Sequence, residues 1–234
     1  MGAGEARGQD APRRSGASVW WVLGVAAGSM TFAVHQDRWL TSESIEDQDT
    51  PSARRLASAA QPLGTPEVIL PAAGLLYAIG HWGSHPRLAD AAFRGGASVA
   101  AAGAVVLALK EATGRARPFQ SPGDPFRFRP FSGMASFPSG HTALAFATAA
   151  ALDRETRSRW IPLVAYPLAA TVAWSRVRDR EHWTSDVLAG AAVGGWTAWH
   201  AGSWLESRAA NRAAGAFDLV PSSSGTKLAY VVHF

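Results

Sequence analysis

Six apolar runs, separated by polar connections, constrain the fold of this chain more than any other feature. They span residues 19–34, 67–80, 88–109, 140–152, 160–174 and 184–205. Runs of this length with few charges form helices that are buried either in a protein core or in a lipid bilayer. The sequence therefore predicts an all-α bundle of about six helices.

The length of the runs and the residues at their ends bear on whether this bundle spans a membrane. A full span needs about 20 apolar residues, and several runs are shorter, so a soluble bundle with buried helices is the alternative. The chain has 10 tryptophans, and several lie at run ends, as in the aromatic belts of membrane proteins. Small residues in the third run allow close helix packing in lipid. We therefore predict a polytopic membrane bundle.

Three regions are predicted along the chain. Residues 1–16 have no apolar period and predict a disordered arm. Residues 17–205 hold the six runs and form the membrane domain. Residues 206–234 form a tail in which two short alternating segments flank a Pro-Ser-Ser-Ser-Gly turn, which predicts a β-hairpin. The first run is either a retained helix, which we favour, or the core of a cleaved signal peptide.

Composition excludes several classes of chemistry. Cysteine is absent, which excludes disulfides and thiolate catalysis. The net charge of +4 comes from an excess of arginine and suits anionic substrates or a membrane surface. These arginines are scattered in short loops, so no nucleic-acid partner is predicted. His81 and His85 have helical metal-ligand spacing, but Gly83 and Pro86 interrupt the helix, so no metal is predicted.

The connection between the fifth and sixth runs concentrates side chains that suit phosphate chemistry. His182 and Asp186 are four residues apart, so they would share one face of a helix. The carboxylate could then hold the imidazole and leave its Nε2 lone pair free. Arg176, in an expected loop, offers a planar guanidinium for phosphate or carboxylate. A charged loop followed by a helix cap is the plainer interpretation of the same residues.

Two further stretches bring cations and a helix start to the ends of apolar runs. Lys110 and Arg117 follow the third run in a Lys-x6-Arg-Pro pattern and begin a long loop. Ser139 and Gly140 open the fourth run in a Pro-Ser-Gly-His sequence that ends at His141. Free backbone N–H groups at a helix start favour an anion, although Ser139 also suits a simple N-cap. Cations, a hydroxyl and two histidines are the groups that phosphoryl transfer requires.

Together, the three stretches resemble the signature of the type 2 phosphatidic acid phosphatase (PAP2) family. Lys110–Pro118, Pro138–His141 and Ser175–Asp186 match that signature at eleven positions without a departure. The resemblance covers about residues 60–205. It implies a bacterial membrane enzyme that hydrolyses a lipid phosphomonoester or pyrophosphate without a metal or another cofactor.

The resemblance also implies a role for each matching residue. His182, oriented by Asp186, attacks phosphorus to give a phosphohistidine, and His141 protonates the leaving oxygen and then activates water. The phosphate would be bound by Lys110, Arg117, Ser139, Gly140 and Arg176. The arginines outside the signature are expected to face solvent or lipid headgroups, with phosphate contact as the alternative: Arg115, Arg178 and Arg180.

Six spans would place all these residues at one membrane face. The opposite face holds a further set of arginines, which makes it cytoplasmic by the positive-inside rule: Arg13, Arg14, Arg87, Arg154, Arg157 and Arg159. The site would then face the periplasm or the cell exterior from the bacterial cytoplasmic membrane.

Three alternatives keep the same phosphate-binding residues. They are a soluble periplasmic acid phosphatase, a vanadium haloperoxidase and a non-catalytic membrane protein that binds phosphate headgroups. The His182–Asp186 pair argues against the last, which would gain nothing from it. Candidate substrates are phosphatidate, phosphatidylglycerol phosphate, a polyprenyl diphosphate and a glycolipid phosphate. The sequence favours none of them and no oligomeric state, because lipid tails are bound by diffuse apolar contacts.

Overall fold

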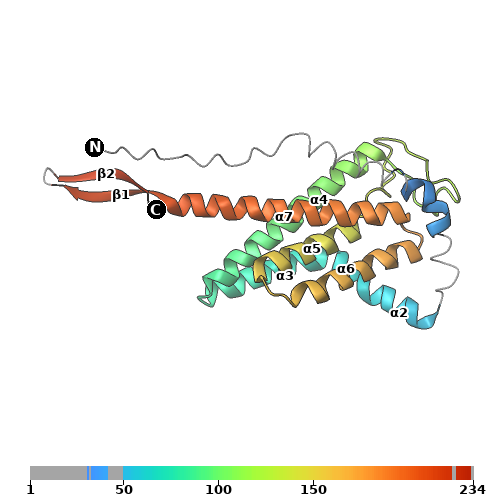
Figure 1. Ribbon diagram of the computed structural model, residues 1–234, viewed down its shortest axis with the longest axis horizontal. Helices are drawn as coiled ribbons and strands as arrows, with labels where there is room; N and C mark the ends of the chain where they lie inside the picture. The colour runs from blue at the N-terminus through green and yellow to red at the C-terminus, as the bar shows by residue number, and fades with distance from the viewer. Residues whose placement is uncertain (1–30, 32, 42–49, 223–224, 233–234) are drawn as a thin grey trace, which may run out of the picture.

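The computed structural model describes residues 31, 33–41, 50–222 and 225–232 (Figure 1). The described chain is mainly helical, as predicted. A helix over residues 33–41 comes first. It is followed by α2 (Pro51–Ala60), a 3-10 turn η1 (Gln61–Gly64), α3 (Pro66–Trp82), α4 (Pro86–Thr113), α5 (Gly140–Thr156), α6 (Ile161–Arg178) and α7 (Thr184–Ala214), and then by strands β1 (Gly215–Ser222) and β2 (Gly225–Val232).

Helix α5 lies at the centre of the bundle. It packs against α4, α6 and α7, while α3 packs against α4, and α2 and η1 lie against α6. Helix α7 runs past the other helices and leads into β1 and β2, which pair as an antiparallel hairpin (Figure 1). The connections α4–α5 and α6–α7 lie at the same end of the bundle.

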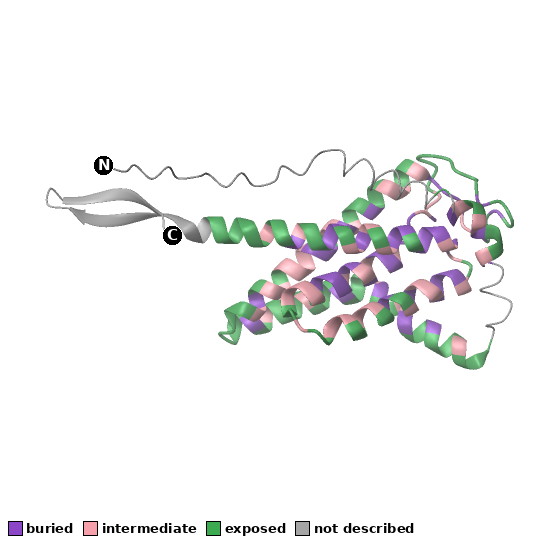
Figure 2. Ribbon diagram, viewed as in Figure 1, coloured by how far each residue is buried: buried purple, intermediate pink, exposed green. Residues whose placement is uncertain are grey.

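The buried residues of the bundle, shown in purple in Figure 2, are smaller than the exposed apolar ones. The two buried clusters consist mainly of alanine and valine: Ile69, Val99, Ala102, Ala147, Ala150, Ala151 and Ala198 in one, and Ala60, Ala145, Ala149, Ala169 and Val172 in the other. Large apolar side chains instead lie exposed on the outer helix faces, among them Leu75, Ile79, Phe93, Leu107, Leu163, Val164, Leu188 and Trp196. Small residues inside and large apolar residues outside are typical of helices that pack in lipid.

Two glycines let α7 approach α5 closely. A Cβ atom on Gly194 would lie 2.1 Å from the carbonyl oxygen of Ala143, and one on Gly190 would lie 2.6 Å from that of Ser139. Only glycine permits backbone contact of this kind. The contact brings the first turn of α7 to the start of α5, where the Ser139 N–H donates to the Asp186 carbonyl at 2.9 Å.

Gly194→Ala is expected to lower the free energy of unfolding by about 1–3 kcal/mol, because the added methyl overlaps fixed backbone. Gly195→Ala is the matched control, since no atom lies within 4 Å of a Cβ at that position. Thermal unfolding of the two purified variants in detergent measures the difference. Equal midpoints would show that the two helices can separate without cost.

The structure differs from the predictions in the first connection and in the tail. Residues 35–61 were expected to form a polar connection. They contain most of the helix over residues 33–41 and all of α2. Helix α2 begins there because the Thr50 hydroxyl accepts from the Ala53 N–H and Pro51 occupies the first turn. Helix α7 continues from residue 205, its predicted end, to Ala214. Residues 1–16 and most of the first apolar run lie outside the described residues.

Helix length provides a separate test for membrane spans. Within the described residues, α4 alone is long and apolar enough to cross a membrane. The pair formed by Pro51–Gly64 and α3, bent by 54°, passes the same test together. Helices α3, α5 and α6 have 17, 17 and 18 residues, near the lower limit of about 17 for a span. Length and composition thus give one or two spans in this part of the chain, fewer than the six predicted.

Candidate active site

The residues assigned to the site from sequence lie at one end of the bundle. In Figure 1, the last turns of α4 and α6 and the first turns of α5 and α7 are found on the same side. These turns and their connections carry Lys110 (α4), Arg117 (α4–α5 loop), Ser139, Gly140 and His141 (start of α5), Arg176 (α6), His182 (α6–α7 connection) and Asp186 (α7).

Several contacts show that these residues converge. A Cβ atom on Gly140 would lie 3.6 Å from Cε of Lys110. Arg176, His182, Lys110 and Arg117 all lie close enough to His141 for their charges to act on it. Four separate segments of the chain therefore meet around His141.

His182 and Asp186 are paired, but not as neighbours on a helix face. Helix α7 begins at Thr184, so His182 precedes it. A turn still brings Nδ1 of His182 to 3.6 Å from Oδ2 of Asp186. Both side chains are buried, and within the described part of the chain Nδ1 has no hydrogen-bond partner. Burial lowers the pKa of the His182 imidazole, with Asp186 opposing the shift, so the neutral form is favoured.

The Asp186 carboxylate is held by three donors. Its Oδ1 accepts from Nη1 of Arg115 at 2.6 Å. Its Oδ2 accepts from the Ser136 hydroxyl and from the Trp183 N–H, the latter at 2.9 Å. Because both oxygens are occupied, the carboxylate has one well-defined orientation toward His182.

Arg115 was expected to face solvent or headgroups, and this prediction is wrong. Its side chain has no exposed surface. Nε and Nη2 donate to the Pro125 carbonyl at 3.0 and 2.7 Å, and Nη1 donates to the Ser185 hydroxyl at 2.7 Å. Nη2 also donates to Oδ2 of Asp37 at 2.7 Å. Sequence reasoning missed this cluster because Asp37 and Asp186 are 78 and 71 positions away from Arg115.

The three cations of the signature differ in the hydrogen bonds and ion pairs that hold them. Nζ of Lys110 donates to the Ala135 carbonyl, and Arg117 pairs with Glu181 where both side chains are about one-third exposed. Arg176 belongs to the last turn of α6, not to a loop as predicted, and its Nη2 lies 3.3 Å from Oδ2 of Asp179. The exposed Arg117–Glu181 pair is weak by nature, so an incoming phosphate can replace the carboxylate.

Ser139 occupies the N-cap position of α5, but its side chain caps no backbone N–H. Its Oγ lies 3.0 Å from Oγ1 of Thr142, and both residues are buried. The first N–H groups of α5 thus keep their capacity to bind an anion beside Lys110.

Among the described residues, no group of three His, Asp or Glu side chains could hold a metal ion. The His81 ring stacks on the Tyr77 ring, with 5.7 Å between the ring centroids.

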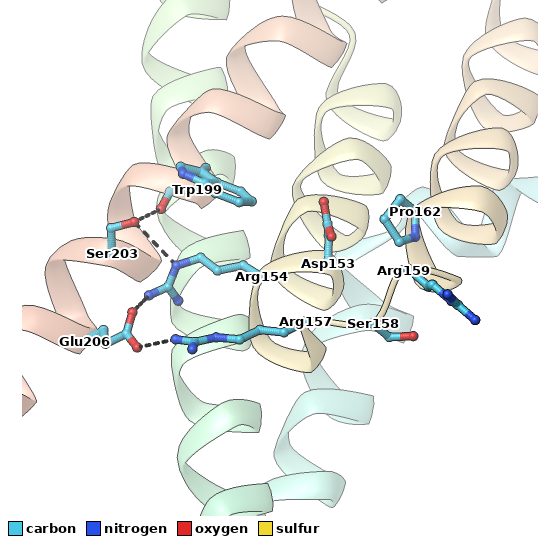
Figure 3. Close-up of a pocket in the computed structure, with 9 residues that line it drawn as sticks. All are labelled: Asp153, Arg154, Arg157, Ser158, Arg159, Pro162, Trp199, Ser203 and Glu206. Carbon is cyan, nitrogen blue, oxygen red and sulfur yellow. Dashed lines mark hydrogen bonds and ion pairs between the residues drawn. The ribbon is translucent and has the colours of Figure 1, made fainter.

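A separate pocket of about 490 Å³ lies between α5, α6 and α7, away from the site residues (Figure 3). Arg154 and Arg157, from the C-terminal end of α5, both pair with Glu206 of α7 across it. None of the site residues lines this pocket, and its ion pairs join two helices at the other end of the bundle.

The chain is similar to three curated lipid A 1-phosphatases. The protein from Porphyromonas gingivalis is 48% identical over 71 residues, which cover 29% of this chain and 16% of the relative. The one from Rhizobium etli is 42% identical over 107 residues, which cover 42% of this chain and 44% of the relative. The chain thus matches less than half the length of these relatives.

A solved structure and a family model extend the comparison. The fold is similar to that of a transmembrane PAP2 type phosphatidylglycerolphosphate phosphatase from Bacillus subtilis, with a TM-score of 0.62 and 18% identity over 82% of this chain and 96% of the other. The model of the PAP2 superfamily matches residues 91–209, just over half of the chain. This match contains all three signature stretches, and the chain therefore belongs to the PAP2 superfamily.

Proposed function

We propose that this protein is a metal-independent phosphatase that hydrolyses a lipid phosphomonoester or diphosphate through a phosphohistidine intermediate. The observation that carries the proposal is the buried His182–Asp186 pair, with Nδ1 and Oδ2 3.6 Å apart, at the end of the bundle that also holds three signature cations. An imidazole kept neutral and oriented by a carboxylate is a nucleophile, and cations beside it stabilise a phosphoryl group.

In the first step, Nε2 of His182 attacks phosphorus and the bond from phosphorus to the leaving oxygen breaks. Asp186 stabilises the positive charge that develops on the imidazole. His141 donates a proton to the leaving oxygen, so the lipid departs as a neutral alcohol or, from a diphosphate, as a protonated monophosphate. A bound phosphate dianion favours the protonated form of His141, because it offsets the surrounding positive charge.

In the second step, the now neutral His141 takes a proton from water. The resulting hydroxide attacks the phosphohistidine, the phosphorus–nitrogen bond breaks, and inorganic phosphate leaves. Lys110, Arg117 and Arg176 stabilise the charge on the phosphoryl oxygens in both steps, together with the Ser139 hydroxyl and the backbone N–H group of Gly140.

We place this chemistry at the outer face of a bacterial cytoplasmic membrane, in a membrane domain over residues 17–205. The large apolar side chains on the outer faces of α3, α4, α6 and α7 support a lipid environment. The relatives named as lipid A 1-phosphatases make the phosphate of a glycolipid a candidate substrate. A role as a non-catalytic binder of phosphate headgroups is less well supported, since binding alone does not require His182.

Phosphate release by detergent-solubilised protein in excess chelator tests this function. The substrates are a short-chain phosphatidate, a polyprenyl diphosphate and a glycolipid 1-phosphate, each at several concentrations. We expect release from at least one of them to be unaffected by the chelator. Release that requires added metal would exclude the proposed mechanism, and tight binding of all three without release would favour the binding protein.

The pH dependence of kcat/KM should follow from the burial of His182. Burial lowers the pKa of this imidazole below its ordinary value near 6.5, and attack requires the neutral form. Activity should therefore rise as pH increases through the lowered pKa and be fully developed on this limb at neutral pH. The falling limb should appear in kcat, because the bound phosphate favours the protonated form of His141 and activity is lost when this proton leaves the substrate complex. The kcat profile should therefore be bell-shaped. A rising limb centred above pH 7 would contradict the assignment.

A further inference from the structure

A completely buried charge cluster adjoins the site. Of the signature residues, it includes Asp186 alone. It consists of Arg115, Asp37 and Asp186, whose side chains have no exposed surface. Arg115 makes five hydrogen bonds through its guanidinium, two of them to the Pro125 carbonyl. A guanidinium has five N–H donors, so all of its hydrogen-bonding capacity is used.

Asp37 comes from the helix over residues 33–41, outside the segment that matches the family model. Its Oδ1 accepts from the Ser185 N–H at 2.7 Å, and its Oδ2 accepts from the Ser185 hydroxyl and from Arg115. Asp37 therefore holds the guanidinium that binds Asp186. It also holds the backbone of Ser185, which immediately precedes Asp186.

We infer that Arg115 and Asp37 are positioning residues, which act through Asp186 to set the orientation and the charge environment of His182. This inference rests on the proposed function, because it assigns the two residues to the nucleophile of that reaction. Neither residue is expected to touch the substrate.

Geometry is the first reason for this assignment. Arg115 occupies Oδ1 of Asp186, which leaves Oδ2 as the oxygen nearest to His182, at 3.6 Å from Nδ1. Without Arg115, Oδ1 would lose its donor and the carboxylate would be held only at Oδ2, by Ser136 and Trp183, so that it could turn about that oxygen. The imidazole would then lose the partner that stabilises the positive charge developing on it.

Burial is the second reason. A fully buried ion cluster contributes little net stability compared with apolar side chains of similar size, although breaking it by removing one partner is costly. A cluster that ends at a catalytic carboxylate is better explained by the need to hold that carboxylate in one orientation.

Charge is the third reason, and it makes the inference testable. The charged and titratable groups that act on His182 come from several elements: Lys110 from α4, Arg117 from the α4–α5 loop, His141 from α5 and Asp186 from α7. The Arg176 and Glu181 side chains lie one step further out, since Arg176 acts on His141 and Glu181 pairs with Arg117. Loss of the Arg115 charge should favour the protonated imidazole, and loss of the Asp37 charge should favour the neutral one. The acid limb of the pH profile should therefore move up in one variant and down in the other.

The test compares Arg115→Gln, Arg115→Lys and Asp37→Asn with wild type on whichever substrate wild type hydrolyses. We expect kcat to fall about 100-fold in Arg115→Gln and about 10-fold in Asp37→Asn, the range that supporting residues typically show, with KM within about threefold. Arg115→Lys keeps the charge but loses the fork, so its acid limb should stay in place while kcat falls.

Arg94→Gln is the matched control. It breaks the partly buried, two-bond Arg94–Glu155 pair, which joins α4 to α5 away from the site. This variant should lose stability and keep the wild-type kcat and pH profile. If Arg115→Gln does not fold, the inference is tested with Asp37→Asn and Arg115→Lys.

Each outcome has a defined meaning. Folded Arg115 and Asp37 variants with wild-type kcat, or with acid limbs that move in the same direction or not at all, would overturn this inference and leave the proposed function intact. A wild type that releases phosphate from none of the substrates would overturn both.

Discussion

His182→Ala is expected to reduce phosphate release by about four orders of magnitude or more, which is the effect of removing a nucleophile that acts with its partner groups as one unit. Alanine leaves no atom that can form the covalent intermediate. Asp186 would keep its donors from Arg115, Ser136 and Trp183, so the fold of this end of the bundle should survive. The loss should therefore appear in kcat.

The measurement is phosphate release in chelator by wild type, His182→Ala and the control His200→Ala. His200 lies exposed on α7, where its Nδ1 contacts the Trp196 carbonyl oxygen at 2.9 Å. It should tolerate alanine without loss of activity. Equal release by His182→Ala and wild type would show that the nucleophile is a different group or water.

His141→Ala is expected to reduce kcat by about 10²- to 10⁴-fold on a lipid phosphomonoester, because the alkoxide would leave without a proton. The size of the loss should depend on the leaving group. An aryl phosphate whose phenolate is stable at neutral pH needs little protonation. The first step of the variant should then approach the wild-type rate.

Rapid mixing of His141→Ala with such an aryl phosphate separates the two roles of this residue. We expect a burst of phenolate equal to the enzyme concentration, followed by slow turnover, because water is no longer activated to cleave the phosphohistidine. An equal loss on both substrate types, without a burst, would indicate that His141 binds the phosphate instead of transferring protons.

The signature stretches illustrate what local sequence can determine. Residue spacing placed Lys110 at a helix end, Ser139 and Gly140 at a helix start, and His182 four positions before Asp186. These features depend on neighbours within about one helical turn or on the ends of apolar runs, so they can be read without knowing the fold. The predicted convergence of the segments at one bundle end followed from the alternation of the helices.

Other features were predictable only in part. Arg176 was expected in a loop, yet α6 extends to Arg178, because charged residues continue a helix as readily as apolar ones when they can pack. The His182–Asp186 pair was expected on a helix face, and the structure forms it across the turn that starts α7. In both cases the residue types indicated the chemistry, but the local sequence did not predict the backbone conformation.

The sequence by itself thus determined the mainly helical class, the family signature and the identity of the candidate catalytic groups. The tertiary structure alone decided that Arg115 is buried and that Asp37 lies in the same cluster as Asp186. The reason is physical. An isolated arginine or aspartate is stable in water, and its burial is possible only where the folded chain supplies a partner. Here those partners lie more than 70 positions away, at 78 and 71 residues from Arg115, beyond the reach of any local pattern.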